Sequence, residues 1–424
     1  MPAIIAIGRL SSPFLRCYGL RWCSSIANYI AELRTRGLIR STYPSKLDTE
    51  FAAELKSLPP VVYAGFDPTS KSLHIGNLLV LVNLLRCSQF GLRPIAIVGG
   101  ATAAVGDPSG RSTERKSQAK DVLLRNTELI AAQLRNIAGN VLNDELIVID
   151  NNTWFKEMSV VDYLRNCKHL RVGEMLRMGA IKSRLSEECG GISFTEFSYQ
   201  TMQAIDWFML LKEYNCRFQI GGSDQLGHLD LGAHYIKRTC EGKFAAGICL
   251  PLVTDRAGNK LGKSVGEGQV WLSADLTSPF HFYQFLRQLH DDEAELMYRY
   301  FSLDHWEDVS AKIAEHRLNL GKWIVQDALA NELTKVVHGE KGLIMAQRCS
   351  RALFSSKMSA CGAVIRGALR RTRVTIFQVR DGRSQILPVF AFVDDGEQLQ
   401  QLREYLNSVG KANLDLKGPT GCIR

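Results

Sequence analysis

Four β-prone runs, separated by stretches with helical apolar spacing, constrain the fold of this 424-residue chain more than any other feature. The runs cover residues 61–66, 94–98, 146–149 and 217–220. Strands that alternate with helices pair in parallel, and the helices cover both faces of the sheet. We therefore predict an α/β fold with a mainly parallel sheet. No apolar run approaches the roughly 18 residues of a membrane-spanning helix, so we expect no membrane among the partners.

The first of these strands leads into the most informative local pattern. Val61–Phe66 is followed by a turn rich in Asp, Pro, Thr and Ser, and then by helical spacing over residues 75–85. We expect Ser72 to cap this helix, which puts His74 and Gly76 in its first turn. Backbone N–H groups and the helix dipole favour an anion at that place. Since a glycine lets a flat ring approach the backbone and a histidine can donate to a phosphate oxygen, the pattern predicts a nucleotide site.

A second pattern lies far along the chain, where Lys260-Leu-Gly-Lys263-Ser264 occurs in a glycine-rich loop. Taken alone, two lysines of a flexible loop are usually just solvated, and His-x-Gly-x is usually an ordinary helix start. Together, and in this order, the two patterns match the paired signatures of the class I aminoacyl-tRNA synthetases.

Within that class the chain resembles the tyrosyl-tRNA synthetases over roughly residues 27–350. The resemblance implies that the chain activates L-tyrosine with ATP, releasing pyrophosphate, and then transfers tyrosine from tyrosyl-AMP to the 3′ end of tRNA(Tyr). Mg²⁺ is expected to accompany ATP, held by phosphates rather than by a protein metal site. Five ordered motifs carry the resemblance: residues 63–69, 98–110, 197–206, 219–225 and the lysine loop.

The resemblance also implies how the chain is divided. A Rossmann-like catalytic domain is expected over residues 26–275, with a mostly helical insertion at 116–195 that carries the interface of a homodimer. Phe194 falls at a position on the two-fold axis of such dimers. Residues 276–354 are expected to form an α-helical anticodon-binding domain. Residues 355–424 would be a small, basic α+β region that binds RNA, although the usual signature of the bacterial C-terminal domain is not found there.

Activation of tyrosine needs no general base, because its ionised carboxylate attacks the α-phosphate directly. The enzyme must instead position the substrates and stabilise charge on the phosphates. The resemblance assigns this catalytic role to a hydroxyl, an imidazole and four cations: Thr69, His74, Lys260, Lys263, Arg111 and Arg115. It assigns ATP binding to a second set, in which Asn77 replaces a second histidine usual in the family: Gly65, Asp67, Gly76, Asn77, Gly222, Asp224 and Ser264.

The amino-acid pocket rests on a buried acid. Asp206 lies on an apolar helix, and a buried carboxylate needs a partner; a phenolic hydroxyl that donates to it, next to Tyr63, would be one. Without the resemblance, an Asp206 that faces solvent or an arginine is the alternative. Tyr199 and Gln203 are spaced i, i+4 and share a helix face with Asp206. The resemblance implies six tyrosine-binding residues: Tyr63, Asp107, Tyr199, Gln203, Asp206 and Gln225.

Positive charge gathers at the two ends of this chain, whose formal net charge is +9. Residues 1–25 carry three arginines and no acid, as mitochondrial transit peptides do, so we expect the protein in the mitochondrial matrix. A basic cluster at 366–373 precedes a strand-like run at 374–379 and either contacts RNA or is a solvated face. Eleven cysteines without metal-ligand spacing suit a reducing compartment, and we expect no bound metal.

Two rival functions remain at this point. One is another adenylating enzyme of the same class, such as a tryptophanyl-tRNA synthetase, against which Tyr63 and Asp206 argue. The other is a non-catalytic RNA-binding protein that keeps the synthetase fold, for instance in intron splicing. Loss of His74 or of both loop lysines would favour it, and all three residues are present.

Overall fold

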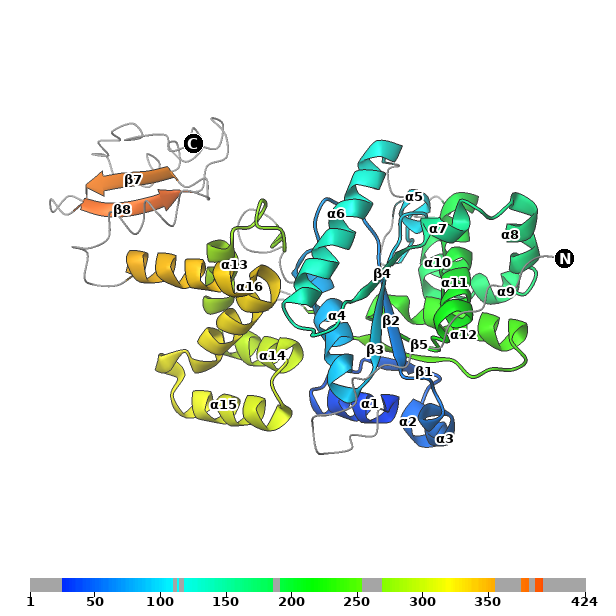
Figure 1. Cartoon of the computed structure of the whole chain (residues 1–424), viewed down its shortest axis with the longest axis horizontal. Helices are drawn as coiled ribbons and strands as arrows, with labels where there is room; N and C mark the ends of the chain where they lie inside the picture. Colours follow the sequence, from blue (N-terminus) through cyan, green and yellow to red (C-terminus); the bar gives the residue numbers. More distant parts are fainter. Residues whose placement is uncertain are drawn as a thin grey trace.

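The computed structural model describes residues 25–109, 113, 118–185, 191–253, 269–354, 375–380 and 386–391. Its central element is a six-stranded sheet with the order β1-β6-β5-β2-β3-β4 (Figure 1). All neighbours pair in parallel except β1, which runs antiparallel to β6. The strands are β1 (Ser41–Tyr43), β2 (Val61–Phe66), β3 (Arg93–Val98), β4 (Ile147–Asp150), β5 (Phe218–Gly222) and β6 (Ala246–Leu250).

The predicted α/β fold with a mainly parallel sheet is confirmed, and so are the four predicted strands, to within two residues at each end. The sequence reading missed β6, a short run without alternation, and β1, which has only three residues. The range 116–195 is mostly helical, but it also contains β4, which pairs with β3 at the sheet edge. Among the described residues of this range, only those after Asp150 form helices without an intervening strand.

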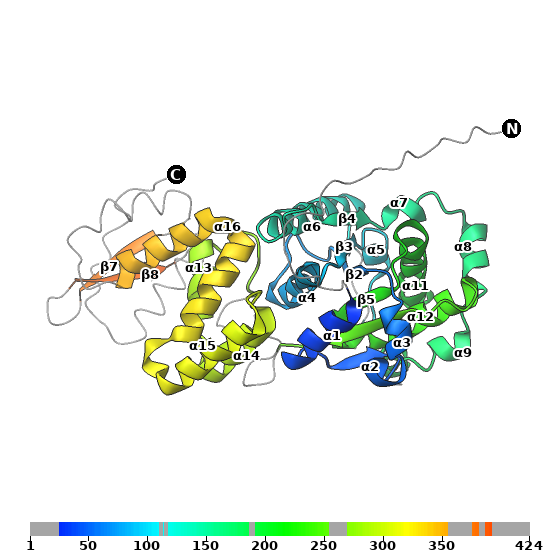
Figure 2. The ribbon, with the colours of Figure 1, turned by 60° about the horizontal axis from the view of Figure 1, so that its bottom comes forward.

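Helices cover both faces of the sheet (Figure 2). On one side lie α1 (Ile26–Thr35), α4 (Ile75–Arg86) and α6 (Lys120–Gly139), and on the other α11 (Phe194–Tyr214) and α12 (Leu226–Thr239). The shorter helices are α2 (Leu47–Glu50), α3 (Ala52–Lys56), η1 (Cys87–Phe90), α5 (Thr102–Val105), α7 (Asn152–Phe155), α8 (Val160–Cys167), α9 (Val172–Met175), α10 (Gly179–Arg184) and η3 (Ser223–Gln225).

The alternation of β2 explains why both faces can be buried. Val62, Ala64 and Phe66 join the apolar core on the side of α4, whereas Val61 and Tyr63 join the cluster that contains Trp207 of α11. Successive side chains of a strand point to opposite faces, so a strand between two helical layers must be apolar throughout. This arrangement aims Tyr63 at α11 and leaves the end of β2 free to lead into α4.

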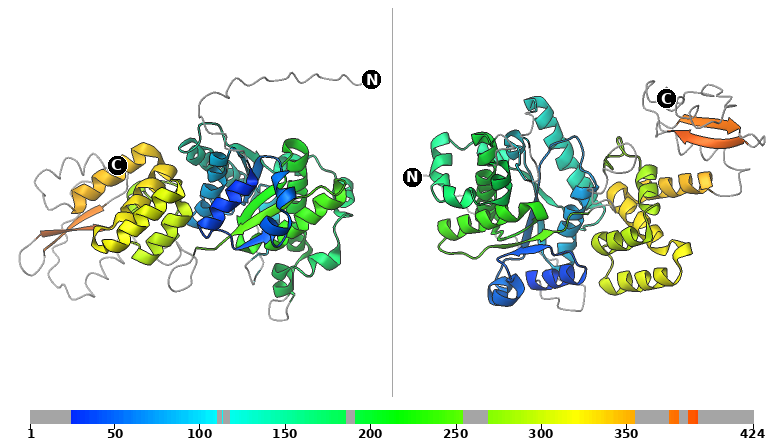
Figure 3. Two further views of the ribbon diagram at one scale, coloured as in Figure 1. Left: turned by 90° about the horizontal axis from the view of Figure 1, so that it is seen from below. Right: turned by 180° about the vertical axis from the view of Figure 1, so that it is seen from behind.

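A bundle of four helices follows the sheet: α13 (Pro279–Arg287), α14 (Asp291–Phe301), α15 (Trp306–Leu318) and α16 (Ile324–Phe354), with η4 (Leu320–Lys322) before the last. We call residues 279–354 the helical bundle; it lies beside α4 and α6 (Figure 3). Gly339 interrupts α16 with φ 70°. Farther on, β7 (Thr375–Arg380) and β8 (Ile386–Ala391) pair antiparallel, and β7 matches the predicted strand. No helix in the described ranges is long and apolar enough to span a bilayer.

Candidate active site

Among the residues predicted to bind nucleotide and amino acid, those that the structure describes lie on or beside one edge of the sheet. From β2 the chain continues to β3 and β4 on one side, whereas β5 and β6 lie on the other side of β2. The connection therefore changes direction between β2 and β5. In open α/β sheets, ligands bind at the carboxyl ends of the strands at such a point. Thr69 and His74 follow β2 here, and Asp224 follows β5.

His74 itself is the N-cap of α4. Its Nδ1 accepts the N–H of Gly76 at 3.0 Å, and the Asn77 side chain accepts the N–H of His74 at 3.1 Å. Ser72 is therefore not the cap that we expected; its Oγ contacts the carbonyl of Leu73. Because Nδ1 accepts, the neutral ring carries its proton on Nε2 and presents a donor there. A Cβ at position 76 would lie 2.9 Å from the His74 ring, so this cap requires glycine.

Both flanks of the predicted lysine loop have described residues, and the second flank is anchored at His74. The N–H of Ile75 donates to the carbonyl of Val270 at 3.1 Å, and the His74 and Trp271 rings lie 6.4 Å apart. The predicted catalytic residues Lys260 and Lys263 and the predicted ATP ligand Ser264 lie outside the described residues, as do Arg111 and Arg115. Residues 269–272 nevertheless return the chain to the edge that carries His74.

Asp67 connects the end of β2 with two other elements. Its carboxylate accepts the hydroxyl of Thr102 at 2.9 Å and that of Tyr199, on α11, also at 2.9 Å. A Cβ at Gly99 would lie 2.1 Å from this carboxylate, so glycine is required beside it. Burial and the carboxylates of Asp67 and Asp107 raise the pKa of Tyr199 well above its ordinary value. Tyr199 therefore remains a neutral phenol that donates to Asp67.

Asp107 is held as a carboxylate by a ring of donors. It accepts the N–H of Ser109 at 2.8 Å and the side-chain amide of Gln225 at 3.0 Å, and His228 lies 3.5 Å away. Burial raises the pKa of Asp107, but the hydrogen bonds and charge interaction with His228 and the bonds from Ser109 outweigh it, so the net pKa falls well below the usual range. A negative charge maintained in this way suits an ammonium ligand.

Asp206 is the second buried carboxylate, and it has two donors. Asn151 donates to one oxygen at 3.0 Å and the indole of Trp154 to the other at 2.9 Å. Burial raises the pKa of Asp206 to about 7, against the lowering effect of these two bonds. The hydroxyl of Tyr63 donates to Gln219 at 2.8 Å rather than to Asp206. Tyr63 packs against Trp207 of α11, the helix that carries Asp206, so the two residues predicted to hold a phenol have different hydrogen-bond partners.

Between the two carboxylates, α11 presents an acceptor with no partner. Oε1 of Gln203 is buried and has no hydrogen-bond partner among the residues that the structure describes. A buried polar atom without a partner is costly, which makes it a candidate contact for a ligand donor. Tyr199, Gln203 and Asp206 thus line one helix face, as their spacing predicted.

Three more of the predicted ATP ligands, Gly65, Gly222 and Asp224, lie at or just after the carboxyl ends of β2 and β5. Gly65 is exposed, with open space where a side chain would be, and Gly222 ends β5 next to Asp224. A Cβ at Gly222 would lie 2.8 Å from the Asp224 carboxylate. In the described part of the chain, no group of three His, Cys, Asp or Glu residues could hold a metal ion.

Five supporting residues were not among the predicted site residues: Thr102, Asn151, Trp154, Gln219 and His228. Thr102 and Gln219 lie within two of the motifs that carry the resemblance, at 98–110 and 219–225, and Gln219 lies within β5 opposite Tyr63. Asn151 and Trp154 directly follow β4, and their usable signal was position, because polar residues at the carboxyl ends of parallel strands gather at one edge.

Comparison with known proteins identifies the relatives of this chain. The profile of the family described as tRNA synthetases class I (W and Y) matches residues 56–355. The mitochondrial tyrosine–tRNA ligase of Drosophila melanogaster is 38% identical over 81% of this chain and 76% of its own. The tyrosine–tRNA ligase 1 of Vibrio parahaemolyticus is 37% identical over 78% and 77%. A C-terminally truncated mitochondrial tyrosyl-tRNA synthetase of Aspergillus nidulans superposes with a TM-score of 0.69, at 28% identity, covering 77% and 94%.

Proposed function

This chain belongs to the class I tRNA synthetases of the tryptophan and tyrosine family, and we propose that the edge between β2 and β5 is its catalytic centre. The chain is a tyrosine–tRNA ligase: it activates tyrosine with ATP and transfers it to tRNA. The observation that carries the residue assignment is a pair of buried carboxylates, Asp107 and Asp206, together with the unpartnered acceptor of Gln203 on the helix that carries Asp206.

In the proposed complex, tyrosine lies along α11. Its ammonium group contacts Asp107, Gln203 and the hydroxyl of Tyr199, while Gln225 holds Asp107 in place. Its phenol donates to Asp206 and lies beside Tyr63. A tryptophan indole is wider than a phenol, and its N–H lies elsewhere on the ring. A site that holds the ammonium at Asp107 and the phenol at Asp206 therefore favours tyrosine.

ATP is proposed to bind on the other side of Asp67. Asp224 contacts its ribose hydroxyls, Gly65 and Gly222 allow close backbone approach, and the first turn of α4 receives its phosphates through His74, Gly76 and Asn77. Thr69, the loop lysines with Ser264, and Arg111 with Arg115 complete the phosphate contacts. Mg²⁺ would travel with the nucleotide and neutralise charge on its phosphates.

The proposed activity predicts a specific exchange reaction. The purified full chain should exchange labelled pyrophosphate into ATP when tyrosine is present. Phenylalanine lacks the hydroxyl that would occupy Asp206, and tryptophan has the wrong shape, so neither should support exchange above the background without amino acid. Absence of exchange with tyrosine would contradict the assignment, and exchange with tryptophan would favour the rival within the family.

A homodimer is proposed from exposed apolar side chains that precede or begin α11. Phe194 is 77% exposed and Val160 is 75% exposed, with Val161 and Leu164 beside it on α8. Large apolar side chains exposed close together in the sequence of one helix, as on α8, favour an interaction site on a soluble protein. It lies within the segment that the sequence predicted to carry the dimer interface.

Phe194→Asp should convert the dimer into monomer, because a carboxylate would be buried without a partner at the interface. Sedimentation velocity should show the mass halved, with an apparent dissociation constant raised at least about 100-fold, equivalent to about 2.7 kcal/mol. Leu318→Asp is the matched control, since Leu318 is 84% exposed but lies on the helical bundle. A dimer that persists in Phe194→Asp would place the interface elsewhere.

The two basic ends of the chain are proposed to have separate roles, in import into mitochondria and in tRNA binding. Residues 1–25 would direct import into the matrix, which agrees with the mitochondrial relatives, although bacterial relatives are equally similar. A reporter fused to these residues that stayed in the cytosol would contradict this.

Residues 355–424 would hold tRNA beyond the bundle, so their deletion should slow tRNA charging and spare pyrophosphate exchange.

A further inference from the structure

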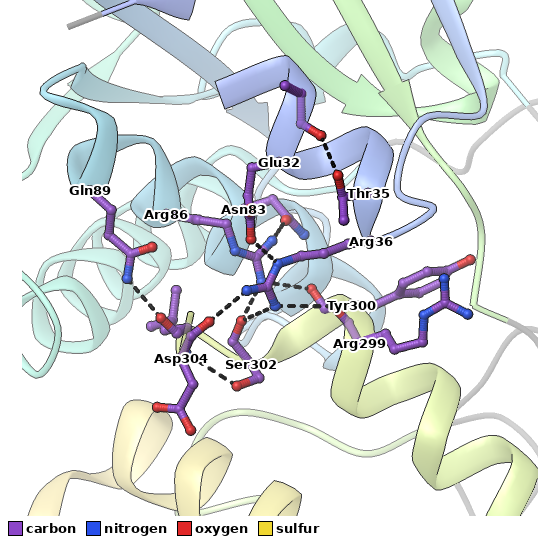
Figure 4. A network of polar contacts seen from close by, with 12 residues as sticks. Glu32, Thr35, Arg36, Asn83, Arg86, Gln89, Arg299, Tyr300, Ser302 and Asp304 are labelled. Atoms are coloured by element: carbon purple, nitrogen blue, oxygen red, sulfur yellow. Dashed lines mark hydrogen bonds and ion pairs between the residues drawn. The ribbon is translucent and has the colours of Figure 1, made fainter. Parts of the chain in front are cut away.

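Two buried arginines join the sheet part of the chain to the helical bundle (Figure 4). Arg36 follows α1 and Arg86 is the last residue of α4; they are 1% and 0% exposed. Both guanidinium groups face one turn of the bundle, residues 299–304, where α14 ends. A fully buried arginine is rare unless its charge is compensated, so this contact requires a physical reason.

The partners of the two arginines are backbone carbonyls at the carboxyl end of α14. The last carbonyls of a helix have no partner within it, and they form the negative end of its dipole. The cations that compensate the end of α14 are Arg36 and Arg86, which are more than 200 positions away in the sequence. Arg36 donates to the carbonyls of Arg299 (3.3 Å), Ser302 (2.9 Å) and Asp304 (2.5 Å), and Arg86 to those of Tyr300 (3.1 Å) and Ser302 (2.6 Å).

Glu32 of α1, on the sheet side of this joint, pairs with Arg36 at 2.5 Å. The backbone carbonyls that accept from both guanidinium groups belong to the bundle. Burial, with Arg36 beside it, lowers the pKa of Arg86 to about 9. Glu332 of α16 accepts the N–H of Leu303 at 2.5 Å and attracts Arg86. If the bundle moved away, two adjacent cations would lose the carbonyls that compensate them, so the contact resists hinge motion.

Arg86 and His74 stand at opposite ends of the same helix. The twelve residues of α4 span about 18 Å, and the helix is rigid because most of its side chains are buried. Its last turn is fixed further, because the carbonyl of Asn83 accepts the hydroxyl of Tyr29 at 2.7 Å. Helix α4 therefore places His74 at the proposed nucleotide site and Arg86 at the bundle.

A second, weaker joint lies at the end of α6. The side-chain amide of Asn140 donates to the carbonyl of Val336 at 2.9 Å, next to the interruption of α16 at Gly339. Helices α4 and α6 both follow strands of the parallel sheet and therefore both end away from the catalytic edge. The bundle thus contacts the far ends of two helices that start at the active site.

We propose that Arg36 and Arg86 are positioning residues for tRNA, which set the distance and angle between the helical bundle and the catalytic cleft. The inference rests on the proposed function, because only a substrate that touches both parts senses their relative placement. Tyrosine and ATP contact the cleft alone. A loosened joint would lower the fraction of molecules with the competent arrangement, and the apparent dissociation constant of tRNA would rise by the inverse of that fraction.

The test compares two activities of the full chain in three variants. Arg86→Met removes the guanidinium and keeps the apolar stem. Arg34→Met is the matched control, because Arg34 also lies on the α1 side but is half exposed and pairs with Asp48. The milder double variant Gln89→Ala/Asn140→Ala removes two exposed donors that reach the bundle carbonyls of Leu303 and Val336.

For Arg86→Met we expect the KM for tRNA in charging to rise at least tenfold, while pyrophosphate exchange stays within twofold of the unmodified chain. The double variant should raise the KM for tRNA about threefold, and Arg34→Met should change neither activity. Equal losses in exchange and charging would overturn the proposal, because Arg86 would then merely support the cleft. So would unchanged charging by a folded Arg86→Met variant.

If Arg86→Met fails to melt cooperatively, the test rests on the Gln89→Ala/Asn140→Ala variant. An unchanged KM for tRNA in that variant contradicts the proposal, and a rise in this KM without a change in pyrophosphate exchange supports it. Failure of the proposed function itself is distinguishable, since the unmodified chain would then charge no tRNA at all.

Discussion

Replacing Asp206 with asparagine is expected to lower kcat/KM for tyrosine in pyrophosphate exchange by about 100-fold, with the KM for ATP within about twofold. The variant replaces a carboxylate acceptor by a neutral amide, and hydrogen bonds to charged groups contribute about 1.5–3 kcal/mol. In the structure Asn151 and Trp154 already donate to this carboxylate. The NH2 group of an asparagine at position 206 would have to face the N–H of Asn151 or of Trp154. This repulsion would also displace the acceptor that the phenol of tyrosine needs.

Discrimination against phenylalanine should fall together with the activity. Phenylalanine lacks the hydroxyl that would donate to the Asp206 carboxylate, so this buried charge loses one of its hydrogen bonds, a penalty for which tyrosyl-tRNA synthetases are the standard example. In Asp206→Asn that penalty shrinks, so the ratio of kcat/KM for tyrosine and phenylalanine should approach one. Asp230→Asn is the control, because Asp230 is a half-buried carboxylate of α12 that pairs with His234. Equal loss of tyrosine and ATP binding would instead assign Asp206 a role in folding.

The pKa of about 7 gives the same experiment a second readout. Burial raises this pKa, so the carboxylate that accepts the phenol is fully formed only above pH 7. Between pH 6 and 8 its ionised fraction rises about tenfold, from about 9% to about 91%, since each pH unit from the pKa changes the ratio of forms tenfold. The KM for tyrosine should fall accordingly as the pH rises, and in Asp206→Asn it should be flat.

The same site shows what can be predicted from sequence and where prediction stops. Tyr199, Gln203 and Asp206 were placed on one face by helical spacing alone, because a long helix fixes the direction of its own side chains. Asn151 and Trp154 were not found, since nothing near them in sequence marks them; β4 brings them to Asp206 only once the sheet is assembled. Spacing along the sequence therefore predicts which side chains share a face of one helix. It does not predict the side chains that another strand of the sheet brings to the same site.

The fold divides in the same way. Strand β2 was predictable because six apolar residues end in a turn, whereas β1 has three residues and depends on pairing with β6 for its existence. The predicted cap of α4 was two residues too early, since serine is the more usual cap residue, whereas His74 caps this helix through its bonds with Gly76 and Asn77. The joint at Arg36 and Arg86 was invisible in sequence, because its acceptors are backbone carbonyls more than 200 positions away.

Two substitutions of His74 should separate its catalytic role from its structural one. Asparagine places its oxygen near the position of Nδ1 and can still cap Gly76, but it has no donor near the position of Nε2. Glutamine can bring its amide near the position of Nε2, but it caps poorly. We therefore expect His74→Asn to keep its thermal stability and to lose about 100-fold or more in the rate of tyrosyl-AMP formation, the usual cost of one donor to a developing charge.

His74→Gln should show the reverse pattern, with more activity than His74→Asn but a stability lower by about 1 kcal/mol, the cost of a lost helix cap. Ser278→Ala calibrates that cost, because Ser278 caps α13 by accepting the N–H of His281 at 3.2 Å, away from the cleft. Single-turnover kinetics and thermal melts on the same preparations give both quantities. Greater activity in His74→Asn than in His74→Gln would show that catalysis needs the cap at Gly76, and that the donor on Nε2 contributes little to holding the phosphates.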